Sequence, residues 1–113
     1  MVALAPNEIM QLYSGIARLM SAMVEAANTR NWETLRDLEN QCRPLTHTLM
    51  AREPDVELPE ELKRDKLLLL KQILADDAAI RAVTQPWMDE LQQLIGRANQ
   101  QQKLNKAYGP GLH

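Results

Sequence analysis

The sequence predicts an all-α fold, an antiparallel helical bundle of three main helices plus a short, mobile C-terminal helix. Along most of the 113-residue chain, apolar residues recur at steps of three and four, the spacing that places them on one face of a helix. The chain also has no Phe and only 4% aromatic residues, whereas sheets favour aromatic and β-branched side chains. Its length suits one compact domain with one core.

The first helix is expected to begin near Pro6 or Asn7, because proline is preorganised for a first helical turn and Asn can cap free amides. Its apolar residues form one wide stripe, which predicts one buried face. The stripe consists of Ile9, Leu12, Tyr13, Ile16, Leu19, Met20, Met23, Val24 and Ala27. Gly15 lies within it and is expected to permit close approach of another helix. The polar residues 28–31 predict a tight turn.

A second helix is expected from Trp32 to about Leu49, because its apolar residues follow a spacing close to a heptad seam. They are Trp32, Leu35, Leu38, Cys42, Leu45 and Leu49. Pro44 lies inside this pattern, and its ring crowds the carbonyl of Asn40, so we expect a kink or a short break there. Residues 51–58 have no periodicity and predict a loop.

Pro59 opens the third expected helix, and two glutamates follow it at the positive end of the helix dipole. One apolar face continues to about Gly96, so at about 1.5 Å per residue the helix spans roughly 50 Å. Pro86 is expected to bend this helix near Ala82. The face consists of Leu62, Leu69, Ile73, Ile80, Val83, Trp87, Leu91 and Leu94.

Four consecutive leucines, residues 67–70, lie in this helix and point about 100° apart, so they cannot all face one core. Two interpretations stay open. The helix is either central and buried by two neighbours, or it presents an exposed apolar groove to a partner's amphipathic helix. On the second interpretation the client-binding groove comprises Leu67, Leu68, Leu70, Ile73 and Leu74.

After Gly96 the chain becomes polar and offers little apolar surface. We therefore expect residues 1–96 to form the core of the helical bundle, with Gly96 as a hinge. Residues 97–113 are expected to form a C-terminal helix or tail that docks marginally and has a regulatory role.

No enzyme site is predicted, and we expect no cofactor and no bound metal. His47 has no second His or Cys at metal-ligand spacing, and Cys42 lies on the apolar seam without the base that a catalytic thiol needs. The four glycines form no phosphate-binding loop, and a net charge of −2 provides no broad field for nucleic acid.

The expected location is the cytoplasm, without insertion into a membrane. The longest purely apolar run has four residues, the N-terminus shows no secretory signal, and a single cysteine suits a reducing compartment. The heptad-like seams leave open whether the protein is a monomer or a homodimer.

One segment near the C-terminus is more specific for a protein family than the helical pattern is. Residues 94–109 read LIGRANQQQKLNKAYG and follow Asp89-Glu90-Leu91 at the end of the long helix. This segment, about 20 residues in all, resembles the C-terminal part of FliT-type flagellar export chaperones. The layout of the first stripe followed by Asn31-Trp32-Glu33 is also similar to that family. Pro44 and Pro86 depart from the family pattern and put the straightness of their helices in doubt.

The resemblance implies a cytoplasmic chaperone that binds the C-terminal region of the filament-capping protein FliD. It implies delivery of that client to the export ATPase complex and to the export-gate protein FlhA, and a C-terminal helix that can fold back over the binding face. Leu104, Asn105 and Tyr108 match the residues that family members use toward the gate. Two alternatives remain, a regulator that sequesters the flagellar master transcription factor and a generic helical protein-interaction module.

Overall fold

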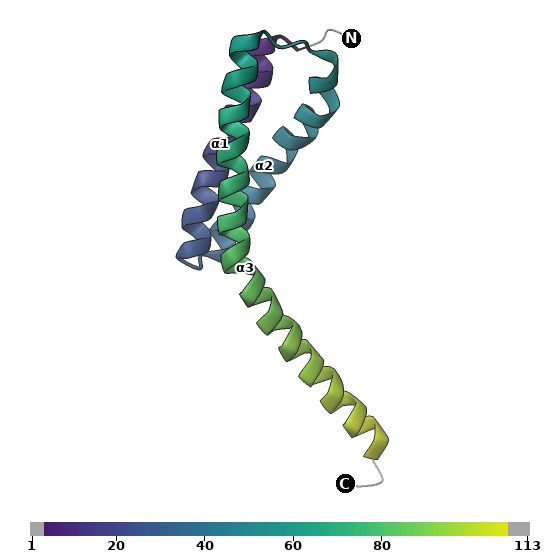
Figure 1. Ribbon diagram of the computed structural model, residues 1–113. Helices are drawn as coiled ribbons and strands as arrows, with labels where there is room; N and C mark the ends of the chain where they lie inside the picture. The colour runs from purple at the N-terminus through teal and green to yellow at the C-terminus, as the bar shows by residue number, and fades with distance from the viewer. Residues whose placement is uncertain (1–3, 109–113) are drawn as a thin grey trace. The chain divides into compact units, whose positions relative to one another are not determined.

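The computed structural model of the protein describes residues 4–108, and side chains are described for residues 4–97. In this part of the chain there are three α-helices and no strand (Figure 1). They are α1 (Pro6–Asn28), α2 (Trp32–Arg52) and α3 (Glu60–Tyr108), and a short 3-10 helix, η1 (Glu53–Asp55), follows α2. The predicted all-α class with three main helices is confirmed. The chain forms two compact units, Met1–Arg81 and Ala82–His113, which are described separately.

In the first unit, α1 begins at Pro6 as predicted and buries most of the predicted stripe, whereas Leu12, Leu19 and Val24 are half-buried. Ala5 precedes the helix; its carbonyl accepts hydrogen bonds from the amides of Glu8 and Ile9, and its own amide donates to Glu8 Oε1 over 3.2 Å. The carbonyl and the amide of Ala5 thus both have hydrogen-bond partners where the helix begins. The buried residues of the helix are Ile9, Tyr13, Ile16, Ala17, Met20, Met23, Ala26 and Ala27.

The predicted tight turn joins α1 to α2. Arg30 adopts a positive φ of 56°, which reverses the chain, and the side chain of Asn31 caps α2 by accepting a hydrogen bond of 3.2 Å from the amide of Thr34. The two helices approach closely at Gly15, where a Cβ would lie 3.3 Å from Leu45 Cδ1. This confirms the expected role of the glycine.

The short break expected at Pro44 does not occur, because α2 runs unbroken from Trp32 to Arg52. A proline inside a helix removes one backbone hydrogen bond and costs about 3 kcal/mol. Cys42 and Leu49, on either side of it, are buried in the core and hold both halves of the helix in place. Packing therefore outweighs the local cost, and α2 continues into the region predicted to be a loop.

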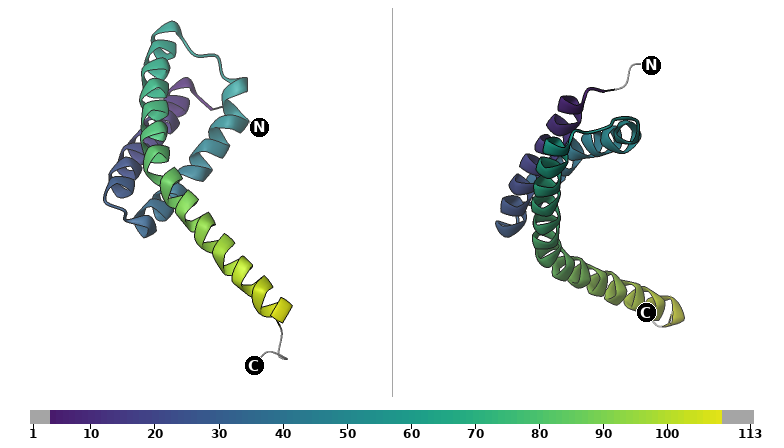
Figure 2. Two further views of the ribbon diagram at one scale, coloured as in Figure 1. Left: turned by 60° about the horizontal axis from the view of Figure 1, so that its bottom comes forward. Right: turned by 45° about the horizontal axis from the view of Figure 1, so that its top comes forward.

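The connection from α2 to α3 contains η1 and an extended stretch that brings Leu58 into the core. Pro59 then starts α3 as predicted, because its carbonyl accepts a hydrogen bond of 2.9 Å from the amide of Lys63. The first part of α3 lies beside α1 in both views of Figure 2. Two hydrogen bonds join them there: the amide of Gln72 donates to Ser21 Oγ over 3.2 Å, and that hydroxyl donates to Asp76 over 3.1 Å.

The core of this unit receives residues from all three helices and from the connection. Its buried members are Ile9, Tyr13, Ile16, Met20, Met23, Cys42, Leu49 and Leu58. From α3, the partly buried side chains Leu62, Leu69, Leu70, Ile73 and Ile80 pack against them. No helix in the described part of the chain is long and apolar enough to cross a membrane.

α3 passes both Pro86 and Gly96 without ending, so the separate helix expected after Gly96 is not confirmed. A glycine costs a helix only about 1 kcal/mol, which is too little to end it without a capping turn. The boundary between the two units falls at Ala82, whose carbonyl the Pro86 ring would crowd. The bend there, and the division into residues 1–96 and 97–113, stay predictions.

Candidate functional site

The leucine run of α3 is divided between the core and the surface. Leu69 and Leu70 pack against the core together with Ile73, whereas Leu67 and Leu68 are 53% and 66% exposed. Leu69 and Leu70 thus fit the buried interpretation of the run. Leu67 and Leu68 have the exposure that the groove interpretation requires, and binding of a partner there stays a prediction. Of the predicted groove residues, Leu70 and Ile73 are half-buried and pack against the core, and Leu70 also lines the pocket beside Leu67.

Leu74 is 64% exposed and lies seven residues after Leu67, which returns it to the same side of the helix. Leu68 is adjacent, about 100° around the helix. We call Leu67, Leu68 and Leu74 the exposed leucine face. Apolar side chains of this size are favourably removed from water, by about 25 cal/mol per Å² buried. The face is thus a candidate binding surface for an apolar partner.

A pocket of about 730 Å³ adjoins this face. Leu67 and Leu70 line it from α3, and residues 53–58 of the connection form the opposite wall. The remaining lining residues are Lys63 and Lys66. Sequence reasoning missed this pocket, because it treated the connection only as a loop; the apolar residues Val56 and Leu58 in front of Pro59 were the available signal.

A polar cluster holds the wall of the pocket in place. Glu53 forms an ion pair with Lys66 at 3.0 Å, and its carboxylate lies near the Tyr13 hydroxyl. Lys66 Nζ also lies 5.6 Å from the centre of the Tyr13 ring. Burial, and next to it the neighbouring Glu53 carboxylate, raise the pKa of Tyr13 well above its usual range. The cluster links η1 to α1 and α3.

Tyr13→Phe is expected to lower the free energy of unfolding by about 1 kcal/mol near neutral pH, because it removes the polar hydroxyl that lies near the buried Glu53 carboxylate. The variant should also lose part of the alkaline pH dependence. The raised folded-state pKa favours the protonated phenol, so its contribution is full below the unfolded pKa of about 10 and is lost as pH rises above it. Urea unfolding between about pH 8 and 11 measures both effects. If the free energy of unfolding changed with pH by the same slope in wild type and Tyr13→Phe, the raised pKa of Tyr13 would be contradicted.

The second unit consists of one helix in its described part, residues 82–108, and one helix alone cannot bury its own apolar side chains. Its exposed apolar residues include Met88, Leu91, Leu94 and Ile95. Gly96 is exposed within this helix, and its role as a hinge is untested. The predicted gate residues Leu104, Asn105 and Tyr108 have their side chains outside the described residues.

The residues considered for catalysis or metal binding are placed as follows. Cys42 is buried in the core, 3.9 Å from Thr46 Oγ1, as the apolar seam predicts, and His47 is exposed. Among the described residues, no three or more His, Cys, Asp or Glu side chains come together as metal ligands. The interpretation of the chain as a non-enzyme stays an expectation.

Comparison with known proteins gives one consistent family. Residues 10–110 match the family described as "Flagellar protein FliT". Relatives with that name are 32% identical in Serratia proteamaculans (strain 568) and 31% identical in Yersinia pestis (strain Pestoides F), each over 91% of this chain and over 84% and 86% of their own lengths. One from Photorhabdus laumondii is 27% identical over 90% of this chain and 82% of its own. No solved structure matches.

Proposed function

The chain belongs to the FliT family of flagellar proteins, and on this premise we propose that it is a cytoplasmic export chaperone for the filament-capping protein FliD. It binds the C-terminal region of FliD and delivers it to the flagellar type III export apparatus. The observation that carries the proposal is the exposed leucine face of α3, whose three side chains are each more than half exposed. An apolar patch on an otherwise well-packed bundle is typical of a protein-interaction surface.

The form of the surface favours a helical client. Leu67 and Leu74 are two turns apart on one side of α3, so a second helix laid along α3 can contact both. The pocket beside Leu67 offers space for a side chain of such a helix. Because the core is complete without these leucines, α3 can bind and release the client without unfolding the bundle.

Calorimetric titration with the C-terminal segment of FliD tests this function. The full chain should bind the segment, and a chain without residues 97–113 should bind it more tightly if that tail covers the leucine face. Equal affinities would keep the chaperone function and discard the cover. If neither form binds, the chaperone proposal is wrong and sequestration of the master transcription regulator becomes the first alternative.

Delivery requires a second contact, which we assign to Leu104, Asn105 and Tyr108 at the end of α3 as the surface toward the export-gate protein FlhA, with the export ATPase complex as a further partner. A tyrosine suits such a contact because it joins an apolar ring to a polar hydroxyl. Tyr108→Ala is expected to leave folding and FliD binding unchanged and to weaken gate binding of the loaded complex at least about tenfold. Titration of the FlhA cytoplasmic domain with the FliD-bound chaperone measures this. Equal gate affinity for mutant and wild type would refute the assignment.

A further inference from the structure

The cations of α3 in the first unit differ in whether they have an acidic partner. Three of the five form ion pairs: Lys63 with Glu60 at 3.4 Å, Lys66 with Glu53 at 3.0 Å, and Arg81 with Asp77. The other two, Arg64 and Lys71, are exposed, and the structure records no ion pair for either among the described residues.

These two cations are the ones that flank the exposed leucine face. Arg64 precedes Leu67 and Leu68 by three and four residues, and Lys71 follows the same leucines by four and three. Lys71 also precedes Leu74 by three. Residues three and four apart are neighbours on a helix surface, so the cations and the leucines alternate on one side of α3.

The stretch of α3 around Lys71 carries no acid, whereas the pocket wall beside Leu67 carries Glu53, Asp55 and Glu57, of which Glu53 pairs with Lys66. Residues 66–75 contain no Asp or Glu, although the whole chain carries a net charge of −2. The acids on the helix near Arg64 are Glu60 and Glu61 in the first turn and Asp65 at the edge of the face. Lys71 has only apolar residues at the four neighbouring positions, which are Leu67, Leu68, Leu74 and Ala75. A carboxylate approaching Lys71 therefore meets no competing acid on α3.

We propose that Arg64 and Lys71 select an acidic amphipathic helix, with carboxylates about two turns apart along the edge of its apolar stripe. This inference rests on the proposed chaperone function and specifies the chemistry of its client. Arg64 and Lys71 are seven residues apart, which corresponds to roughly 10 Å along α3, so two carboxylates with the same spacing pair with both cations. The leucines bind the apolar stripe between them.

A protein helix fits this surface better than an anionic membrane. Membrane-surface helices bury a long, continuous apolar face in the lipid, whereas this face has three leucines over two turns. The surface also continues into the pocket beside Leu67, which suits a protruding side chain and not a flat bilayer.

The ion pairs of Arg64 and Lys71 with the client carboxylates affect the register of the bound helix and its association rate more than the total affinity. Exposed ion pairs are individually weak, about two- to fivefold in affinity each, so the leucines supply most of the binding. The charges disfavour clients with basic residues at the same positions, because like charges would then meet. Arg64 and Lys71 are thus specificity residues.

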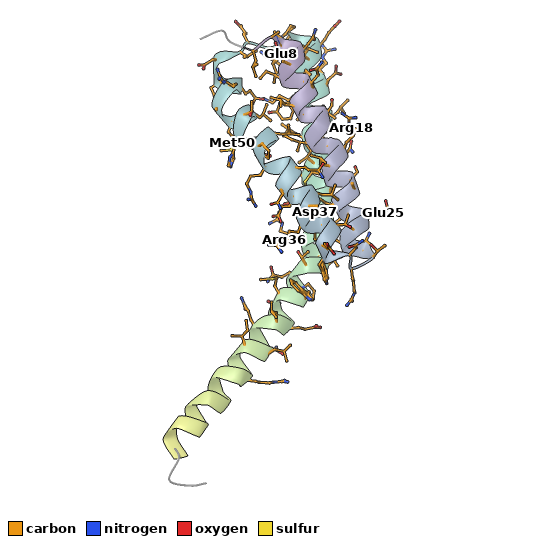
Figure 3. All side chains as sticks on the ribbon, turned by 180° about the vertical axis from the view of Figure 1, so that it is seen from behind. Glu8, Arg18, Glu25, Arg36, Asp37 and Met50 are labelled. Atoms are coloured by element: carbon orange, nitrogen blue, oxygen red, sulfur yellow. The ribbon has the colours of Figure 1, made fainter. Side chains whose placement is uncertain are left out.

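The test is a titration of the full chain with the C-terminal segment of FliD at roughly 50 mM and 500 mM salt. The double variant R64E/K71E is expected to bind about tenfold more weakly at low salt, with a smaller difference at high salt. Lysine substitutions of the acids that border the apolar stripe of the segment should restore binding to this variant. The matched control is R18E/R36E, with the same charge change at two exposed positions on α1 and α2 (Figure 3), and it should bind as the wild type does.

The outcomes separate the two proposals. If wild type and R64E/K71E bind the segment equally, the acidic-client inference is overturned and the chaperone function stands. If the wild type fails to bind the segment, the chaperone function itself fails. Sedimentation with phosphatidylglycerol vesicles tests the alternative partner, an anionic membrane. If R64E/K71E no longer binds the vesicles but still binds the segment, the patch belongs to a membrane and the inference is overturned.

Discussion

Replacing Leu68 and Leu74 together by Asp is expected to weaken binding of the FliD C-terminal segment by at least about 100-fold, without change in the stability of the protein. Burying a leucine contributes about 1.5–3 kcal/mol, and two such losses exceed the roughly 2.7 kcal/mol that corresponds to 100-fold. The introduced carboxylates would in addition lose water on binding. Because both leucines are about two-thirds exposed in the free protein, the bundle does not depend on them.

The matched control for this variant is Met50→Asp. Met50 lies on α2, is 73% exposed and is labelled in Figure 3. If the exposed leucine face is the binding surface, this substitution should change affinity by less than about twofold. An equal loss of affinity in Met50→Asp would show that any exposed apolar residue matters, and would contradict the assignment to α3. Thermal unfolding of both variants should stay within about 0.5 kcal/mol of the wild type.

Ile9→Ala is expected to lower the free energy of unfolding by about 3 kcal/mol. Ile9 is completely buried, where α1 packs against the rest of the core. Its truncation removes transfer free energy and leaves a cavity, and such substitutions cost about 2–5 kcal/mol. Since small domains are stable by only about 5–15 kcal/mol, this is a large share of the total. Urea unfolding followed by helical circular dichroism measures it.

Two further variants keep this prediction specific. Ile9→Val removes one methyl group and should cost about 1 kcal/mol. Leu67→Ala removes a side chain of similar size from a position that is 53% exposed, and should change stability by less than about 0.5 kcal/mol. If Leu67→Ala destabilised the protein as much as Ile9→Ala, the division of α3 into a core side and an exposed face would be wrong.

Much of the fold followed from local sequence signals. Pro6, the turn at residues 28–31 and Pro59 mark chain positions where backbone chemistry alone decides the outcome, and the structure has helix boundaries at all three. The signals failed where they implied a break inside a helix. α2 continues through Pro44 because the packing of Cys42 and Leu49 outweighs the cost of the proline, and α3 continues through Gly96 because a glycine costs a helix only about 1 kcal/mol.

The candidate site was predictable only in part. Four consecutive leucines require that some face away from the core, and this holds for Leu67 and Leu68. Which leucines these are depends on the rotation of α3 against α1 and α2, which periodicity does not determine when two stripes are adjacent. Leu70 and Ile73, which the sequence places in the groove, are half-buried and pack against the core. The pocket depends on the path of residues 53–58, for which Val56 and Leu58 before Pro59 indicate burial but not the direction of the chain.

The most direct test of the account maps the client on the protein by NMR of leucine and isoleucine methyl groups. The C-terminal segment of FliD is added to the full chain, and methyl shifts are followed residue by residue. Binding of the client to the exposed leucine face predicts large methyl shift changes at Leu67, Leu68 and Leu74 and none at Ile9. Changes confined to other methyl groups, with these three leucines unaffected, would contradict the claim that the client binds the exposed leucine face of α3.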